Sequence, residues 1–278
     1  MLVRHPSAAF ASEARIAEQW QELNYRAAPA LDRAVAEFEQ FVRHLTKAGA
    51  EVLLANGTEP LTLDALYVRD AAVITDAGAI LCAMGKPARA GEPAALRTDL
   101  TAAGIALLGA IEGAGRLEGG DVCWLPGNRL AVGRGYRTND EGIRQLRALL
   151  RGCTDEVVEV PLPHWRGPSD VFHLMSILSP LDADLALVFS PLLPVPFRER
   201  LLAMGIALVD VPDAEFETLG CNVLALGPRH CLMTEGNPVT QSRMEAAGVR
   251  VVTFPGEEIC RKGGGGPTCL TRPLAREG

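Results

Sequence analysis

Five residues that could carry chemistry recur along the chain at intervals of roughly fifty residues. They comprise two carboxylic acids, an imidazole, an amide and a thiol: Asp64, Asp121, His173, Asn222 and Cys269. A thiolate is a strong nucleophile near neutral pH, a histidine can move a proton, and carboxylates can hold a cation. If the fold brings these positions to one centre, they suit covalent catalysis on a small cationic ligand.

The sequence around Cys269 sets this cysteine apart from the other six. Four glycines, 263–266, precede it and allow close backbone approach while leaving the thiol accessible. No Gly-Lys-Ser/Thr follows the glycines, which argues against a phosphate-binding loop. A purely structural role for Cys269 stays open. We expect the remaining cysteines to be small buried hydrophobes: Cys82, Cys123, Cys153, Cys221, Cys231 and Cys260.

Among the histidines, only His173 falls on the recurring position, although His164 and His230 are equally available by type. A histidine beside apolar residues is often a satisfied core residue, so that alternative also stays open. Glu118 and Asp121 flank a Gly-Gly pair directly before an expected strand, and Asp70 ends an apolar run that begins at Leu66. Acids in such surroundings are candidates for binding or acid–base work.

The elements that must position these residues form a repeated unit of strand, strand, helix and strand. Hairpins are expected over 71–84, 121–133, 176–190 and 222–235, each followed by a helix, a glycine stop and a further strand. The helix expected over 29–48, with Leu31, Val35, Phe38, Val42 and Leu45 on one face, has no hairpin before it. We expect 2–4 and 269–274 to supply its missing strands. Thr138 and Glu141 have capping-box spacing at the third of the five helices.

This repeat predicts an α/β fold in which five ββαβ blades form a propeller that the two chain ends close. An open doubly wound sheet is the alternative, although it needs strand–helix–strand crossovers without hairpins. No linker or low-complexity tract divides the chain, so we predict a single domain over residues 1–278.

Composition limits the partners of this 278-residue chain. The net charge is −7 and the isoelectric point about 5.4, which argues against nucleic acid and anionic membranes as partners. No apolar run is long enough to span a bilayer, and the first twenty residues lack the apolar core of a signal peptide. No cysteine or histidine cluster has zinc spacing, and no cofactor motif is present. We therefore expect a cytoplasmic protein with free thiols, without metal or cofactor, and leave a homo-oligomer open.

Several of these motifs together resemble the guanidine-modifying enzymes, a superfamily that includes dimethylarginine dimethylaminohydrolase, arginine deiminase and the arginine amidinotransferases. The resemblance rests on Leu117-Glu-Gly-Gly-Asp-Val122, Asp64-x5-Asp70, Phe172-His-Leu-x-Ser176, the glycines before Cys269, and Arg137-Thr-Asn139. It covers nearly the whole chain and is strongest toward the dimethylargininase branch. That family is a five-bladed α/β propeller, in agreement with the repeat.

The resemblance also implies roles for residues. Cys269 would be the nucleophile, His173 the general acid and base, and Glu118 and Asp70 would bind the guanidinium with Asp64 close by. Arg89 and Arg137 would hold the α-carboxylate of an amino-acid substrate, and Asp121 would support the site from behind. The implied reaction turns arginine or Nω-methylated arginine into citrulline plus ammonia or an amine through an S-alkylthiouronium intermediate, without a cofactor.

Alternatives remain open at this point. An arginine amidinotransferase would use the same residues with an amine in place of water, and a non-catalytic binding module could share the propeller. One position departs from the dimethylargininase pattern, because Arg69-Asp70 stands where that pattern has Glu-Asp. Arg-Asp looks more like arginine deiminases and amidinotransferases, and Arg69 could face the amino-acid end of the substrate or turn outward. We further expect the segment 10–25 to cover the site.

Overall fold

The chain folds as an α/β protein built from five small sheets in a computed structural model that describes residues 1–57, 61–170 and 172–275. Four sheets have three strands each, and a fifth pairs β1 (Leu2–Val3) with β2 (Leu53–Leu54) in parallel. The recurring unit of the sequence therefore corresponds to separate sheets, not to one continuous sheet. An open doubly wound sheet, the alternative considered above, is wrong.

Each three-stranded sheet consists of an antiparallel hairpin and a third strand that returns parallel to its second strand after a helix. The first sheet has β3 (Ala72–Thr75), β4 (Gly78–Leu81) and β5 (Leu107–Ala110), with α4 (Glu92–Ala102) before β5. The second has β6 (Val122–Leu125), β7 (Arg129–Arg134) and β8 (Glu156–Pro161), with α5 (Asp140–Leu149) before β8. The third has β9 (Leu178–Asp182), β10 (Leu185–Val188) and β11 (Ala207–Asp210), with α6 (Val195–Ala203) before β11. The fourth has β12 (Leu224–Gly227), β13 (His230–Thr234) and β14 (Arg250–Phe254), with α8 (Pro238–Ala246) before β14. All four expected hairpins are confirmed.

The fifth unit is a two-stranded sheet, β1 and β2, to which the C-terminal end of the chain adds an isolated bridge. Leu2 pairs with Leu53 across the β1–β2 ladder, and it also forms an antiparallel bridge with Arg272. The bridge has two backbone hydrogen bonds of 2.9 Å, one in each direction between residues 2 and 272. Between β1 and β2 lie α1 (Pro6–Ala9), α2 (Glu13–Gln19) and α3 (Leu31–Lys47). The structure thus confirms that 269–274 and 2–4 come together.

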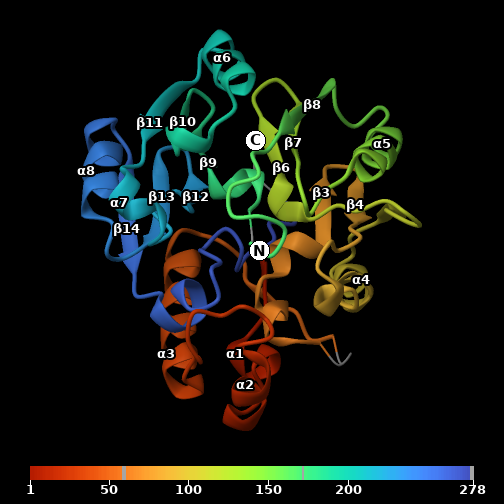
Figure 1. Ribbon diagram of the computed structural model, residues 1–278, viewed down its shortest axis with the longest axis vertical. Coiled ribbons are helices and arrows are strands. Elements are labelled where there is room, and N and C mark those ends of the chain that lie inside the picture. Colours follow the sequence, from red (N-terminus) through yellow and green to blue (C-terminus); the bar gives the residue numbers. More distant parts are fainter. Residues whose placement is uncertain (58–60, 171, 276–278) are drawn as a thin grey trace.

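The helices lie on the outside of the molecule. Figure 1 shows α3, α4, α5, α6 and α8 at the periphery and the strands toward the middle. The remaining elements are short: α7 (Asp213–Phe216) and seven further turns of helix. Within the described residues, none of the helices is both long enough and apolar enough to cross a bilayer.

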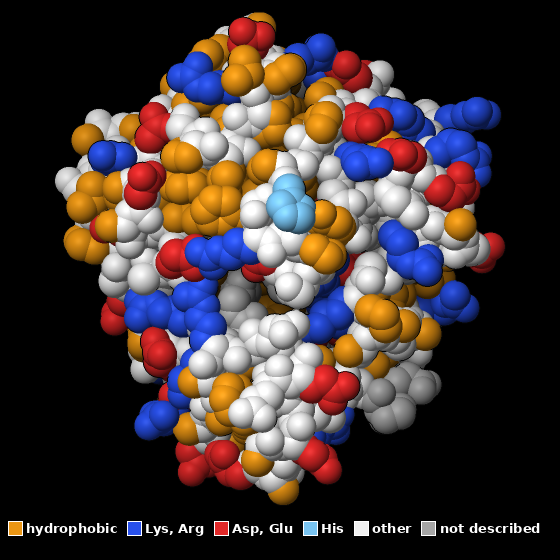
Figure 2. All heavy atoms as spheres, viewed as in Figure 1, with side chains coloured by type: hydrophobic (Ala, Val, Ile, Leu, Met, Phe, Trp, Pro, Cys, Tyr) orange, Lys and Arg blue, Asp and Glu red, His pale blue; other side chains and the backbone are white. Residues whose placement is uncertain are grey.

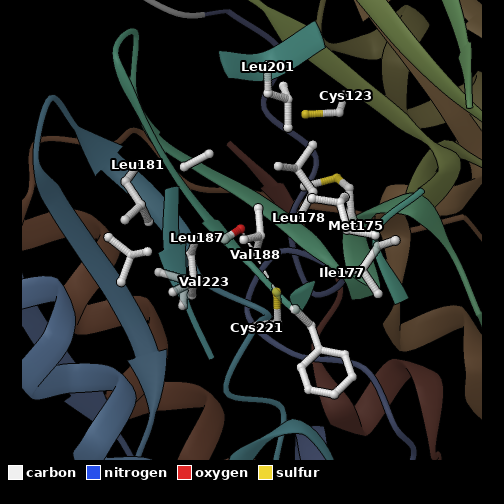
Figure 3. Close-up of a cluster of buried hydrophobic side chains, with 14 of the residues drawn as sticks. Cys123, Met175, Ile177, Leu178, Leu181, Leu187, Val188, Leu201, Cys221 and Val223 are labelled. Carbon is white, nitrogen blue, oxygen red and sulfur yellow. Dashed lines mark hydrogen bonds between the residues drawn. The ribbon is translucent and has the colours of Figure 1, made fainter. Parts of the chain in front are cut away.

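Apolar side chains fill the space between neighbouring sheets. The largest cluster joins Leu178 and Leu181 of β9, Leu187 and Val188 of β10, and Leu201 of α6 (Figure 3). Two cysteines, Cys123 of β6 and Cys221 before β12, take part in this cluster as small apolar groups. Five of the six cysteines that we expected to be structural are buried, and Cys153 is partly exposed.

One local expectation is wrong. The N-cap of α5 is Asn139, whose side-chain oxygen accepts from the backbone of Gly142 at 2.8 Å. Thr138 does not cap the helix, because its hydroxyl donates to Asp121 at 2.6 Å. This difference matters below, since it ties the start of α5 to the polar centre of the molecule.

Candidate active site

Glu118 and His173 form the centre of a buried polar cluster. Glu118 directly precedes the short helix η4 (Gly119–Asp121), and His173 directly precedes η5 (Leu174–Ser176). His173 Nε2 and Glu118 Oε2 lie 2.7 Å apart, and the backbone N–H of Gly85 donates to Glu118 Oε1 at 2.9 Å. The Glu118 side chain is fully buried. This cluster of Glu118, His173, Asp121 and Asp70 is called the acid–imidazole half below.

Asp121 holds this half together from behind. Its carboxylate accepts from the Thr138 hydroxyl at 2.6 Å and from the backbone N–H of Leu174 at 3.0 Å. Burial is the main cause that raises the pKa of Asp121 to about 6, partly offset by His173 and these two hydrogen bonds. Because Leu174 follows His173 in sequence, Asp121 fixes the backbone that carries the imidazole.

The Gly-Gly pair within the acid motif is required by close packing. A Cβ atom at Gly119 would lie 2.2 Å from the carbonyl oxygen of Arg69. A Cβ atom at Gly120 would lie 2.4 Å from His173 Nδ1 and 2.8 Å from Asp70 Oδ1. Any side chain at position 120 would therefore displace the imidazole or the carboxylate.

The charges around His173 favour its protonated form. Burial alone would lower its pKa, but the carboxylates of Asp70, Asp121 and Glu118 raise it to about 9. Burial of Glu118 acts in the opposite sense, yet the hydrogen bond from His173 and the nearby arginines bring the pKa of Glu118 well below its ordinary value. At neutral pH the pair is therefore an imidazolium beside a carboxylate.

Asp70 presents one carboxylate oxygen that is not used. Its Oδ2 accepts from Arg89 at 2.6 Å, whereas its Oδ1 lies 4.0 Å from His173 Nδ1. This Oδ1 is buried and makes no hydrogen bond within the part of the chain that the structure describes. Oxygen and nitrogen atoms of Asp70, Glu118 and His173 lie within 4.8 Å of one another, a spacing that could hold a cation. A buried carboxylate oxygen without a partner is costly, so it marks a place where a positively charged group binds.

Cys269 belongs to a second, mostly uncharged group of residues, called the thiol half below. Asn222 connects this half, because its Nδ2 donates to Cys269 Sγ at 3.4 Å while its Oδ1 accepts from the Thr268 hydroxyl at 2.7 Å and the Thr268 N–H at 3.1 Å. Burial raises the pKa of the Cys269 thiol and the charge of Asp70 raises it further, whereas Asn222, Arg69 and Thr268 lower it. The net result is a thiol that holds its proton.

The glycines before Cys269 have a packing role. A Cβ atom at Gly263 would lie 2.0 Å from the Tyr67 hydroxyl, and one at Gly265 would lie 2.5 Å from the Tyr67 ring. A Cβ atom at Gly266 would lie 2.5 Å from the amide of Asn222. The glycine run thus lets the chain pass over Tyr67 and lets Asn222 reach the nucleophile, as close approach requires.

The two halves meet at the dipeptide Arg69-Asp70. Asp70 faces His173, and the backbone N–H of Arg69 donates to the carbonyl oxygen of Cys269 at 3.2 Å. The thiol and the imidazole therefore flank the same two residues. Asp121 contacts the residue after His173, Asn222 contacts Cys269, and Arg69-Asp70 links these two pairs. Asp64, the fifth recurring residue, pairs with Lys86, so convergence of all five on one centre stays a prediction.

Two other predicted binding residues, Arg89 and Asp64, already have partners. Arg89 donates to Asp70, to both oxygens of Glu92 at 2.8 and 2.7 Å, and to the carbonyl of Tyr67. These partners differ from the substrate carboxylate that we expected for it. Asp64 forms an ion pair with Lys86 at 2.6 Å. The predicted roles of Arg89 and Asp64 toward a substrate stay predictions.

Arg137 lies beside Glu118, with its Nη1 3.3 and 3.4 Å from the two carboxylate oxygens.

The segment 10–25 reaches the site, because Lys86 Nζ donates to the carbonyl of Leu23 at 2.8 Å as well as to Asp64. That this segment covers the site stays a prediction.

Sequence reasoning missed four residues that hold the site: Lys86, Glu92, Thr138 and Thr268. Two of them lie beside residues that were found, since Thr138 follows Arg137 and Thr268 precedes Cys269. Arg69 is buried, at 5% exposure, so the outward orientation considered for it is wrong. Its Nε donates to the carbonyl of Thr268 at 2.5 Å.

Comparison with known proteins points to one family. A family profile described as N,N dimethylarginine dimethylhydrolase, eukaryotic, matches residues 7–276. The N(G),N(G)-dimethylarginine dimethylaminohydrolase of Streptomyces coelicolor is 30% identical over 207 residues, which are 74% of this chain and 73% of that protein. An arginine deiminase of Mycobacterium marinum is 30% identical over 195 residues, 58% of this chain, and the chain spans only 47% of that enzyme's length.

Solved structures share the fold. The dimethylarginine dimethylaminohydrolase of Pseudomonas aeruginosa, a cysteine-to-serine mutant complexed with citrulline, has a TM-score of 0.76 at 22% identity and covers 97% of this chain and 96% of its own. The N-terminal domain of ArgZ, an arginine dihydrolase from cyanobacteria bound to product, has a TM-score of 0.80 at 20% identity and covers 99% and 96%.

Proposed function

Because the chain belongs to the N,N-dimethylarginine dimethylhydrolase family, we propose that it is a cysteine-dependent hydrolase of a guanidino compound. The proposed substrate is arginine or an Nω-methylated arginine, and the products are citrulline and ammonia or an amine. The names of its relatives, which include both dimethylargininases and arginine deiminases, support this class of substrate.

The observation that carries the proposal is the unused oxygen of Asp70. A guanidinium is planar, positively charged and rich in N–H donors, and a carboxylate binds it well. Asp70 Oδ1 is buried without a partner among the described residues and lies 4.0 Å from the imidazole. We assign guanidinium binding to Asp70 and Glu118, with Asp121 and Asp64 supporting the site through their own contacts.

The proposed reaction begins from a resting site in which both Cys269 and His173 hold a proton, because the pKa of each is raised. Binding of the cationic substrate beside the thiol favours loss of its proton to solvent. The thiolate forms a bond to the guanidinium carbon, and the imidazolium donates its proton to the departing nitrogen, whose C–N bond breaks.

Neutral His173 then takes a proton from water, and the resulting hydroxide adds to the carbon of the S-alkylthiouronium intermediate. The C–S bond breaks, the added hydroxyl group loses its proton to solvent, the ureido product leaves, and the thiolate is restored. Asp70 and Glu118 keep the nitrogens in place through both steps and counter their charge.

For an amino-acid substrate, we assign the α-carboxylate to Arg137, which is held at one nitrogen by Glu118. Arg89 was expected to share this role, but its contacts with Asp70 and Glu92 fit better with orienting Asp70. Agmatine, which lacks this carboxylate, tests the assignment directly.

We also propose that the five sheets form one closed five-bladed propeller, as a single domain over residues 1–278. The Leu2–Arg272 bridge and the peripheral helices of Figure 1 support this arrangement. One face of the molecule has a hollow near its middle, bordered by charged side chains of both signs (Figure 2).

Seven free cysteines also fit a protein of the reducing cytoplasm.

A substrate panel tests the proposed function. Arginine, mono- and dimethylarginine, agmatine and a guanidino acid are incubated with the wild type and with Cys269→Ser, and ureido product and released amine are measured without an added acceptor amine. Product from the wild type alone is expected. No product from any substrate, or equal product from Cys269→Ser, would rule out the hydrolase; product only with an added amine would identify an amidinotransferase.

A further inference from the structure

Arg69 donates hydrogen bonds to two consecutive backbone carbonyl groups, those of Thr268 and Cys269. Its backbone N–H donates to the carbonyl oxygen of Cys269 at 3.2 Å, and its side-chain Nε donates to the carbonyl oxygen of Thr268 at 2.5 Å. We propose that Arg69 is a positioning residue, which fixes the segment carrying Cys269 and favours its thiolate through a nearby positive charge. This inference rests on the proposed function in that it takes Cys269 to be the nucleophile.

The remaining polar groups of the same segment have other partners. The N–H of Cys269 donates to the carbonyl of Gly266 at 2.9 Å, and the N–H of Thr268 donates to Asn222. The amide of Asn222 holds the sulfur from one side, while Arg69 holds the backbone from the other. Loss of the Arg69 side chain would remove one hydrogen bond to the Thr268 carbonyl and leave the hydrogen bonds of Asn222 in place. The thiol half would then be held less rigidly but would keep its arrangement.

The backbone of Arg69 is itself fixed against the acid–imidazole half. The clearance at Gly119, where a Cβ atom would lie 2.2 Å from the Arg69 carbonyl, shows how tightly the two segments pack. Asp70 follows directly and faces His173. The dipeptide Arg69-Asp70 therefore sets the spacing between the thiol and the imidazole, with one side chain serving each half.

Arg69 lines a cavity of about 240 Å³ together with Cys123, Met175, Thr268 and Arg272, and none of the residues assigned to substrate binding lines it. Of these residues only Thr268 touches the thiol half, and none belongs to the acid–imidazole half. This placement favours an action of Arg69 through Cys269 over direct recognition of the substrate.

Several ionisable groups act on the thiol. Burial is the largest influence and raises its pKa, Asp70 raises it further, and Arg69 lowers it. Two more groups near the thiol, Tyr67 and Cys260, have pKa values raised well above their ordinary range by burial, so both are uncharged at neutral pH. Among the charged side chains that act on the sulfur, Arg69 therefore opposes Asp70.

The test measures the pH dependence of alkylation of Cys269 by iodoacetamide, with Cys269→Ser giving the background from other cysteines. Removal of a charge of this kind shifts the inflection by about one pH unit. For Arg69→Met we expect an upward shift of that size and alkylation about tenfold slower at pH 7. Arg69→Lys keeps a positive charge but not the planar donor to Thr268, so we expect an inflection near the wild-type value and at least about fivefold lower kcat for the best substrate.

The matched control is Arg4→Met, because Arg4 is also buried, at 4% exposure, but pairs with Asp99. It should leave the inflection unchanged. A wild-type inflection in folded Arg69→Met would overturn the inference; if that variant does not fold, a wild-type kcat in Arg69→Lys would overturn it. Alkylation needs no turnover, so a failed substrate panel with a shifted inflection would refute the hydrolase and leave the role of Arg69 intact.

Discussion

The two halves of the candidate site are held in place by different forces. The acid–imidazole half is a buried network of charges, in which Glu118 binds His173 at 2.7 Å and Asp70 binds Arg89 at 2.6 Å. The thiol half depends on neutral hydrogen bonds from Asn222 and on glycines that pack against Tyr67. The first half is held mainly by charge pairs, and the second mainly by neutral hydrogen bonds and close packing.

The difference has a chemical meaning. Buried carboxylates raise the pKa of the imidazole, whereas burial, with a further contribution from Asp70, raises the pKa of the thiol. The resting protein therefore has a proton donor but no ready nucleophile. A bound cation would favour loss of the thiol proton while the imidazole keeps its own. The substrate itself would therefore complete the site by generating the nucleophile.

The largest effect is expected at the thiol half. Cys269→Ser replaces the nucleophile while Asn222 can still donate to the new hydroxyl, so the fold should survive. We expect kcat to fall by more than about 10⁴-fold, as in other enzymes that lose their nucleophile. Steady-state rates and a thermal melt measure the two quantities. Residual activity above a few per cent would show that the sulfur is not the attacking atom.

A smaller loss is expected when the proton donor is removed. In His173→Gln, a neutral amide replaces the imidazolium between Glu118 and Asp70, and kcat should fall by about 10²- to 10⁴-fold. Alkylation of Cys269 should persist in this variant, because the thiol half keeps its own contacts. Loss of alkylation together with turnover would contradict the division into two halves. His164→Gln, outside the cluster, is the matched control.

Asp70→Asn affects both halves and should mainly weaken substrate binding. The carboxylate that faces the cation becomes neutral, and we expect kcat/KM to fall by about 10²-fold, largely through KM. Alkylation of the free enzyme should become faster at pH 7, because the charge that raises the pKa of Cys269 is gone. The opposite signs of the two effects distinguish this prediction from general damage. Slower alkylation would contradict it.

A final effect concerns the pH dependence of stability. His173 has a pKa raised to about 9 in the folded chain and an ordinary value near 6.5 when unfolded. Its contribution to stability is therefore complete below about pH 6.5 and is lost as the pH rises through 9. Urea unfolding at several pH values should show wild type losing, relative to His173→Gln, on the order of 3 kcal/mol over this window. A constant difference between the two proteins would show that the imidazolium is not stabilised by its neighbours.

Much of the architecture was predictable because local signals repeat. Each hairpin has a turn with Gly, Pro, Asn or Asp, and a glycine follows each of α3, α4, α5, α6 and α8, so these elements followed from short stretches of sequence. The recurring position also indicated His173, Asn222 and Cys269 without knowledge of the fold. The glycine pair after Glu118 was recognised as significant, although its reason, the clearance to His173 and Arg69, is visible only in three dimensions.

The partners of the arginines were not predictable in this way. Arg69 and Asp70 lie in the short helix η2 (Val68–Ala71), where no periodic pattern tells which way a side chain points. Arg89 lies three residues before Glu92, and its burial between that acid and Asp70 depends on the packing of two separate segments. Thr138 and Asn139 are both good capping residues, and only the position of Asp121 decides between them.

The bridge between Leu2 and Arg272 imposes an order of events on a chain that is being made by a ribosome. Residue 2 emerges before its partner, which follows only after some 270 further residues, and these take on the order of 15 to 50 s to synthesise. Cys269 arrives within the same few residues as Arg272. A nascent chain would thus carry its imidazole and its acids well before its nucleophile, and the reactive centre could not be complete until Cys269 had emerged.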